Sequence, residues 1–416
     1  IKTVSGFAFS MPPAPIHFAQ VKCYAHFLCR AKDLQSIQIR LTYYRVDDGE
    51  IRYIEEEHTA DELAEFYADL LARVEYRARI LEERQTVLLP AIAGGRFPFS
   101  SVRVGQDDLI RACYRAISTG KRLFVDAPTG IGKTVSTLYP ALRALGEGKC
   151  EKVFYLTAKT ITRTVAEQTF QMLRQQGLQL KSVILTAKDK ICFMEQTQCN
   201  PEHCPYAKGH FDRINEAMYD LLTHEDSFSR EKIEEYAHKH KVCPFEFCLD
   251  MSLYADAIIG DYNYLFDPHV YLKRFFGENG SKNYVFLIDE AHNLVERGRE
   301  MYSAVLVKED FMALKKQVKA IDSVLEKRLD KCNKILLGYK RECETYQIED
   351  DVDVFVGALQ SLSSRMEKFL EDHDENDHFV PVDVREAVLN FYFEVSHFLM
   401  IWEGLDENYS VNTRFE

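Results

Sequence analysis

A phosphate-binding loop pattern in the first third of the chain constrains its fold more than any other feature. The apolar run Leu123–Ala127 leads into the segment Ala127-Pro-Thr-Gly-Ile-Gly-Lys-Thr134. A loop of this kind joins a strand to the first turn of a helix, and its backbone N–H groups surround phosphate oxygens. We therefore expect a strand, this loop and a helix in succession, within a parallel sheet crossed by helices.

The residue types of this loop predict how it would bind ATP. The Lys133 ammonium would reach the β- and γ-phosphates, and the Thr134 hydroxyl would ligate Mg²⁺. The loop residues expected around the phosphates are Thr129, Gly130, Ile131, Gly132 and Lys133.

Four further apolar runs, each short and bounded by turn residues, complete the expected sheet. They are Val153–Thr157, Val183–Thr186, Ala257–Asp261 and Val285–Asp289. Short runs that alternate with helical segments are typical of a parallel sheet with helices on both faces. The sequence therefore predicts an α/β fold for this part of the chain.

Paired carboxylates follow the last of these runs, in the order Asp289-Glu290-Ala291-His292. Phosphoryl transfer needs this chemistry, because Asp289 would hold Mg²⁺ through water and Glu290 would polarise the attacking water. An acidic pair after a strand also occurs at helix N-termini, where the macrodipole stabilises it. The phosphate-binding loop favours the catalytic interpretation.

The two motifs together resemble those of superfamily-2 helicases, and specifically the XPD/DinG iron–sulfur branch with its DEAH box. Three further matches are Arg103-x-Gly105-Gln106, the turn Thr157–Thr160 and the segment Asp261–Leu265, and the resemblance covers about residues 97–410. It implies a RecA-like domain in which Arg103 and Gln106 lie near the adenine and His292 belongs to the catalytic motif.

The same resemblance implies that Thr160 and Asn263 lie near the DNA path or couple to it. An ordinary helix cap for Thr160 and an ordinary turn for Asn263 remain open as alternatives.

Four cysteines lie in an insertion between the loop and the acidic pair, at positions 192, 199, 204 and 243. Four thiolates hold either a tetrahedral Zn²⁺ or a [4Fe–4S] cluster, and spacing alone does not choose between them. The resemblance favours [4Fe–4S] on Cys192, Cys199, Cys204 and Cys243, with Zn²⁺ and four unrelated buried thiols as alternatives. Cys248 is interpreted as a small core residue.

Three side chains of this insertion, Tyr206, Lys208 and Arg213, are candidates to stack on a DNA single strand or to neutralise it. A solvated helix face explains them equally well.

The first ninety residues contain the pattern Gln20-x-x-x-Tyr24, which places both side chains on one helix face. With Lys2 before it and a β-hairpin after it, the pattern resembles the C-terminal part of a RecB-like PD-(D/E)XK nuclease. Lys2 would be the lysine of the nuclease motif, and its acidic metal ligands would precede Ile1. Ordinary helix packing is the alternative for Gln20 and Tyr24.

These features predict five parts. Residues 1–90 form a partial nuclease-like α/β segment and residues 91–101 form a linker. The RecA-like domain comprises residues 102–186 and 251–295, the iron–sulfur domain comprises residues 187–250, and the helical arch comprises residues 296–416. Because neither a second set of strands nor a second motor signature follows His292, we expect a fragment whose second RecA-like domain belongs to the same polypeptide.

The net charge of −13 does not exclude nucleic acid, because residues 149–190 carry eight Lys or Arg against three Asp or Glu. No apolar stretch approaches the roughly 20 residues that span a bilayer, and no signal peptide is evident, so no membrane partner and a bacterial cytoplasmic location are expected.

The predicted function is an ATP-dependent DNA helicase that moves 5′→3′ on single-stranded DNA and unwinds forked DNA in repair or recombination. The alternatives are a nuclease with an ATP-gated motor-like domain and a non-enzymatic nucleotide-gated DNA-binding module.

Overall fold

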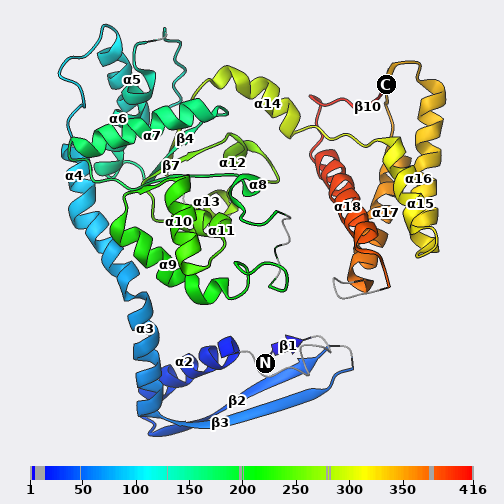
Figure 1. The fold of residues 1–416 in the computed structure, drawn as a ribbon, viewed down its shortest axis with the longest axis horizontal. Coiled ribbons are helices and arrows are strands. Elements are labelled where there is room, and N and C mark those ends of the chain that lie inside the picture. The colour runs from blue at the N-terminus through cyan, green and yellow to red at the C-terminus, as the bar shows by residue number, and fades with distance from the viewer. Residues whose placement is uncertain are drawn as a thin grey trace. The chain divides into compact units, whose positions relative to one another are not determined.

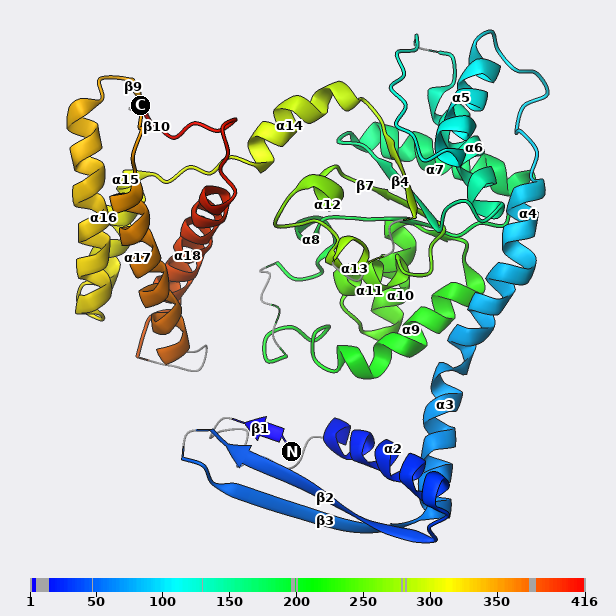
Figure 2. The same cartoon turned by 180° about the vertical axis from the view of Figure 1, so that it is seen from behind.

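The computed structural model describes residues 2–4, 15–46, 48–128, 130–195, 199, 201–277, 280, 283–373 and 379–414 (Figures 1 and 2). The chain divides into two compact units. The first comprises residues 1–155, 159–260 and 283–287, and the second comprises residues 156–158, 261–282 and 288–416.

The N-terminal part of the first unit is a three-stranded sheet covered by one helix. Its elements are β1 (Lys2–Val4), α2 (Pro15–Lys32), β2 (Ser36–Arg45) and β3 (Ile51–Thr59). Strand β1 pairs parallel to β2, and β2 pairs antiparallel to β3, which confirms the predicted hairpin. Residues of α2, β2 and the next helix, α3 (Ala60–Glu83), form a small core.

Thr59 and Glu62 stand at the spacing of a capping box, which predicts the start of a helix, and α3 starts there. The Glu62 backbone N–H donates to the Thr59 hydroxyl, and the Thr59 N–H donates to the Glu62 carboxylate. The helix then continues through the π-helical turn η1 (Arg84–Leu88) into α4 (Leu89–Gly94). Residues 91–94 of the expected linker therefore belong to a helix, in which the buried side chain of Ile92 joins the core of the central sheet.

The central sheet of the first unit has five strands in the order β6-β5-β7-β4-β8, and β5 pairs parallel to both β6 and β7. The strands are β4 (Lys152–Leu156), β5 (Ser182–Ile184), β6 (Ser227–Phe228), β7 (Ala257–Gly260) and β8 (Tyr284–Ile288). Four of them match predicted runs. The fifth, β6, comes from the cysteine insertion, which therefore contributes one edge of the sheet.

Helices lie on both faces of this sheet, which confirms the α/β fold (Figures 1 and 2). One group comprises α5 (Gln106–Ser118), α6 (Lys133–Gly146) and α7 (Thr160–Gln175), and the other comprises α8 (Lys188–Ile191), α9 (His210–His224), α10 (Arg230–His240) and α11 (Pro244–Met251). The core on the first face joins apolar side chains of α4, α6 and α7 to those of β4 and β7.

The predicted strand before the phosphate-binding loop does not form, and this prediction is wrong. Residues 121–128 have no regular secondary structure, and the Phe124 side chain is 90% exposed. Apolar composition alone does not make a strand, because strand propensity reflects packing against neighbouring strands. In the described sheet β8 is the edge, and this run is not paired with it.

The second unit is mainly helical. It begins with the short elements α12 (Asn263–Phe266), α13 (Lys273–Phe276), η2 (Ala291–Asn293) and α14 (Leu294–Met301). Four longer helices follow, α15 (Lys308–Val318), α16 (Ser323–Glu342), α17 (Asp353–Asp372) and α18 (Val382–Glu403), together with the antiparallel strands β9 (Tyr346–Ile348) and β10 (Asn412–Arg414). The four longer helices enclose one hydrophobic core.

The sequence predicts one continuous helix over residues 308–346, but the structure divides it into α15 and α16. The Asp322 side chain accepts hydrogen bonds from the backbone N–H groups of Val324 and Leu325, which makes it the N-cap of α16. An N-cap residue has non-helical dihedral angles, so the chain turns there and α16 packs beside α15. In the described part of the chain, no helix is long and apolar enough to cross a membrane.

Candidate functional site

The predicted phosphate-binding loop contains two glycines with left-handed backbone angles. Gly130 and Gly132 both have φ of +84°, a region that glycine adopts without steric cost. Gly132 is also closely surrounded, because a Cβ added there would lie 2.9 Å from the Gln106 Nε2. The loop ends at Lys133, the first residue of α6, and Thr134 lies in the first turn. Thr129 lies outside the described residues.

The side chains of Arg103 and Gln106 form hydrogen bonds to the backbone of this loop. The buried Gln106 side chain accepts a hydrogen bond from the Arg103 backbone N–H at 3.0 Å and donates one to the Ile131 carbonyl at 3.1 Å. The Arg103 guanidinium donates to the Gly130 carbonyl. The structure therefore brings the two residues expected near the adenine into direct contact with the residues expected around the phosphates.

The Lys133 side chain is directed into the loop. Its ammonium donates to the Ala127 carbonyl at 3.2 Å, and the side chain is half-buried. An ammonium held by a single carbonyl keeps two further donors, which is suited to an anion at this helix N-terminus.

The acidic pair directly follows β8, in the second unit. The Asp289 backbone N–H donates to the Leu156 carbonyl at 3.0 Å, and the Asp289 carboxylate accepts a hydrogen bond from the Glu290 N–H at 3.1 Å. Glu290 has a φ of +52°, which costs a non-glycine residue about 1–2 kcal/mol. Such backbone strain is concentrated at functional sites. The His292 Nε2 lies 3.5 Å from the Glu290 carboxylate.

Tyr262 holds this strained turn in place, and sequence reasoning missed it. Its hydroxyl donates to the backbone carbonyls of Asp289 and Glu290, and the residue is fully buried. Burial raises the pKa of the Tyr262 hydroxyl, and the nearby Asp289 carboxylate raises it further, so the phenol remains a donor. Its position next to Asn263 was the only available signal.

Asn263 is connected to the helix that follows the acidic pair. Its side-chain oxygen accepts a hydrogen bond from Arg297 of α14 at 2.8 Å, and Arg297 also pairs with Asp261 at 3.6 Å. Arg297 was likewise missed, because nothing in the local pattern around it indicates a long-range partner.

The cysteine insertion does not form a metal site in the part of the chain that the structure describes, where no group of three or more His, Cys, Asp or Glu side chains could hold an ion. Cys192 ends α8 and Cys243 precedes α11 as its N-cap. A hydrogen bond to the Cys199 thiol raises the pKa of Lys188, and burial raises the pKa of the Cys243 thiol.

The expected DNA-contact residues have different environments. The Tyr206 ring packs edge-on against Phe193, and its hydroxyl lies 3.2 Å from the His238 Nδ1. The Arg213 guanidinium donates to the backbone carbonyls of Lys208, His240 and Lys241, so it ties the start of α9 to the end of α10. Lys208 and Thr160 have exposed side chains; Thr160 is the first residue of α7.

The three nuclease-like residues of the N-terminal part form a chain of hydrogen bonds. The Lys2 ammonium of β1 donates to the Gln20 Oε1 at 2.8 Å, and the Gln20 Nε2 donates to the Tyr24 hydroxyl at 3.1 Å. A strand and a helix therefore bring together the residues that the sequence pattern singled out.

Comparison with known proteins gives two helicase families. The DEAD_2 family profile matches residues 157–311, and the DEAD/DEAH box helicase profile matches residues 106–204. The chain is therefore similar to XPD-like superfamily-2 helicases.

Curated relatives agree with these profiles. The general transcription and DNA repair factor IIH helicase subunit XPD of Dictyostelium discoideum is 22% identical over 73% of this chain and 40% of its own length. The XPD/RAD3 subunit of Saccharomyces cerevisiae is 23% identical over 70% of this chain and 41% of its own length. A probable ATP-dependent helicase of Methanocaldococcus jannaschii is 26% identical over 56% of this chain and 35% of its own length. The chain thus spans about two fifths of the first two relatives.

Two solved structures are also similar. A solved XPD helicase structure aligns with 73% of this chain and with 51% of its own chain, with a TM-score of 0.45 and 17% sequence identity. A truncated XPD matches 72% of this chain and 81% of its own, with a TM-score of 0.45 and 19% identity.

Proposed function

We propose that this chain contains the ATP-binding motor part of an XPD/DinG-type DNA helicase, which moves 5′→3′ along single-stranded DNA and unwinds forked DNA during repair or recombination. The observation that carries this proposal is the loop Gly130–Lys133 at the start of α6, held by Arg103 and Gln106. This arrangement presents backbone N–H groups and one ammonium to a phosphate group. The similarity to helicase families supports the same conclusion.

Each catalytic residue would have a distinct task in ATP hydrolysis. Lys133 would neutralise the phosphates, Thr134 and Asp289 would hold Mg²⁺, and Glu290 would accept a proton from the attacking water. Bound Mg²⁺ would offset negative charge on the phosphate oxygens. The strained backbone at Glu290, held by Tyr262, supports this assignment because it fixes the backbone position from which the carboxylate extends.

Contacts within the second unit suggest how hydrolysis would be coupled to DNA. Tyr262 binds the backbone of Asp289 and Glu290, and the adjacent Asn263 is hydrogen-bonded to Arg297. A shift of the acidic turn would therefore be transmitted to the segment around Asn263, which the resemblance assigns to DNA coupling. We propose a second RecA-like domain as the surface against which this motion acts.

We further propose that Cys192, Cys199, Cys204 and Cys243 hold a [4Fe–4S] cluster, with Zn²⁺ as the alternative. Two contacts show that residues next to these cysteines lie close together. Lys188 contacts Cys199. Phe193, which follows Cys192, packs against Tyr206, which lies two residues after Cys204. The described arrangement does not itself fit a metal ion, so no step of the mechanism is derived from the cluster. Iron content and the visible absorption of anaerobically purified protein decide between the two groups.

The central test compares ATP binding and ATP hydrolysis in three variants. Lys133→Ala should lose both, and Glu290→Gln should bind ATP without hydrolysing it. Lys121→Ala, which removes an exposed lysine from the segment that precedes the loop, is the matched control and should retain both. Single-stranded DNA should stimulate hydrolysis in the complete protein. Unchanged hydrolysis in Lys133→Ala would contradict the proposed site.

A second candidate function, DNA cleavage, is favoured by the hydrogen-bonded set of Lys2, Gln20 and Tyr24. The test is cleavage of linear and supercoiled DNA with Mg²⁺ or Mn²⁺. Lys2→Ala should reduce metal-dependent cleavage. Lys22→Ala, on the helix α2 that carries Gln20 and Tyr24, should not. Absence of cleavage by the complete protein would exclude this candidate.

A further inference from the structure

Helix α16 has a row of lysines on a domain that is otherwise acidic. Residues 308–342, which form α15 and α16, contain ten Lys or Arg and six Asp or Glu. Residues 343–416 contain four Lys or Arg and eighteen Asp or Glu. Positive charge in the four-helix domain is therefore concentrated on one helix pair.

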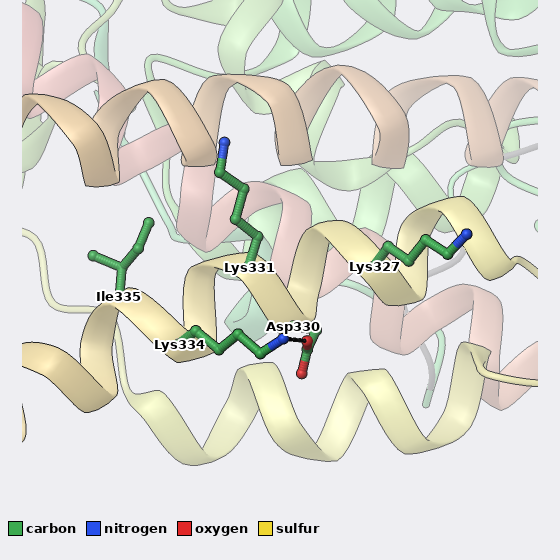
Figure 3. Close-up of a pocket in the computed structure, with 5 residues that line it drawn as sticks. All are labelled: Lys327, Asp330, Lys331, Lys334 and Ile335. Carbon is green, nitrogen blue, oxygen red and sulfur yellow. Dashed lines mark ion pairs between the residues drawn. The ribbon is translucent and has the colours of Figure 1, made fainter.

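An open hollow of about 450 Å³ lies along α16, the helix that carries all its lining residues (Figure 3). The lining residues are Lys327, Asp330, Lys331, Lys334 and Ile335. The three lysines are exposed and spaced over seven residues, so they follow about 10 Å of the helix. We call these three residues the α16 lysine row.

The single carboxylate in the hollow does not cancel this charge. Asp330 is paired with Lys315 of α15 at 2.6 Å and with Lys334 at 2.8 Å. These two ammonium groups hold the pKa of Asp330 below its usual range. Among the residues that the structure describes, Lys327 and Lys331 form no ion pair, so their charges are available to a ligand.

The chemistry of the hollow fits a phosphate backbone better than a small molecule. Small-molecule pockets are mostly apolar, whereas here only Ile335 is apolar. Lysines alone are sufficient for contacts to phosphate, which position a protein on nucleic acid without reading its sequence. Single-strand sites add aromatic rings on which bases stack, and no aromatic side chain lines this hollow.

We propose that the α16 lysine row binds the phosphate backbone of duplex DNA, through residues other than those proposed to bind the nucleotide or the single strand. This inference rests on the proposed function, because it assumes a DNA substrate. Duplex DNA presents one negative charge per about 1.7 Å of its axis, so the row meets several phosphates at once.

The test measures binding of the full chain to a blunt duplex and to a single strand of equal length over a series of salt concentrations. The variant is K327Q/K331Q/K334Q, which keeps good helix formers at exposed positions. The control is K368Q, an exposed lysine on α17. Circular dichroism verifies that both variants are folded.

For the duplex, log K falls as log salt rises. The triple variant should make this fall less steep by about 2 to 3, because each lost phosphate contact reduces the steepness by about 0.9. Single-strand binding and nucleotide binding should be unchanged, and K368Q should match the parent chain. An unchanged duplex slope, or an equal loss on both DNAs, would overturn the inference while leaving the proposed function intact. Loss of polyglutamate binding with intact duplex binding would instead assign the row to an acidic protein. If the parent chain bound neither DNA, the proposed function and the inference would both fail.

Discussion

The substitution Gly132→Ala tests whether the loop geometry explains nucleotide binding. Gly132 has a φ of +84°, and an added Cβ would lie 2.9 Å from the Gln106 Nε2. Alanine would therefore be strained in its own backbone and would displace the side chain that holds the loop. The two effects can be separated by choosing the right control.

The backbone strain alone costs about 1–2 kcal/mol, since L-residues are disfavoured in the left-handed region. Displacing Gln106 adds the loss of its hydrogen bonds to Arg103 and Ile131, each worth about 1 kcal/mol net. Because 1.4 kcal/mol corresponds to a factor of ten, we expect ATP affinity to fall by about tenfold or more.

Gly148→Ala is the matched control. Gly148 has a φ of +73°, but nothing lies within 4 Å of an added Cβ. Both substitutions should reduce the free energy of unfolding through the same backbone strain, and only Gly132→Ala should also weaken ATP binding. Fluorescent-nucleotide titration and denaturant unfolding measure the two quantities separately.

Two results would refute this reasoning. One is unchanged ATP affinity in Gly132→Ala, which would show that the loop does not need the described geometry. The other is equal loss of affinity in Gly148→Ala, which would show that general destabilisation explains the effect.

Three further predictions concern other parts of the chain. Burial lowers the pKa of Lys152 to about 8, from 10.5 in the unfolded chain. Between these two pH values the folded state binds fewer protons than the unfolded state, so the free energy of unfolding should rise with pH there. Lys152→Met should reduce this rise, as measured by denaturant titrations at several pH values. Asp322→Ala removes the N-cap of α16 and leaves Arg365 without its ion pair, so the helical domain should lose about 2–4 kcal/mol in chemical unfolding while ATP binding persists; a smaller loss than 1 kcal/mol would contradict the cap assignment. Cys243→Ser should lose bound iron and loosen residues 187–250 to protease, whereas Cys248→Ser should do neither; the reverse result would change the ligand assignment.

The features that the sequence predicted well depend on local interactions. The turn at Asp48-Gly49 joins β2 to β3, and the reciprocal bonds of Thr59 and Glu62 start α3. Both involve residues within a few positions of each other, so the sequence pattern contains all the information that determines them. The start of α6 at Lys133, directly after Gly132, belongs to the same class, because a short motif determines it.

The features that the sequence did not predict depend on distant partners. In the sequence, Arg213 is only a cation on a predicted helix. The fold shows that its guanidinium donates hydrogen bonds to the backbone carbonyls at the end of α10. Asp322 interrupts an amphipathic pattern that is otherwise continuous, because its side chain caps α16 and pairs with Arg365. Neither contact leaves a periodic signal in the sequence.

The acidic turn after β8 shows why the candidate site needed both kinds of information. The order Asp289-Glu290 indicates metal and water chemistry, but it does not indicate how Glu290 is kept at a φ of +52°. Tyr262 provides that support from a segment about thirty residues earlier, by donating to the carbonyls of Asp289 and Glu290. Because a strained residue persists only where its surroundings determine it, the functional assignment of Glu290 and the structural assignment of Tyr262 depend on each other. Replacing the phenol by phenylalanine would remove the support without touching either carboxylate.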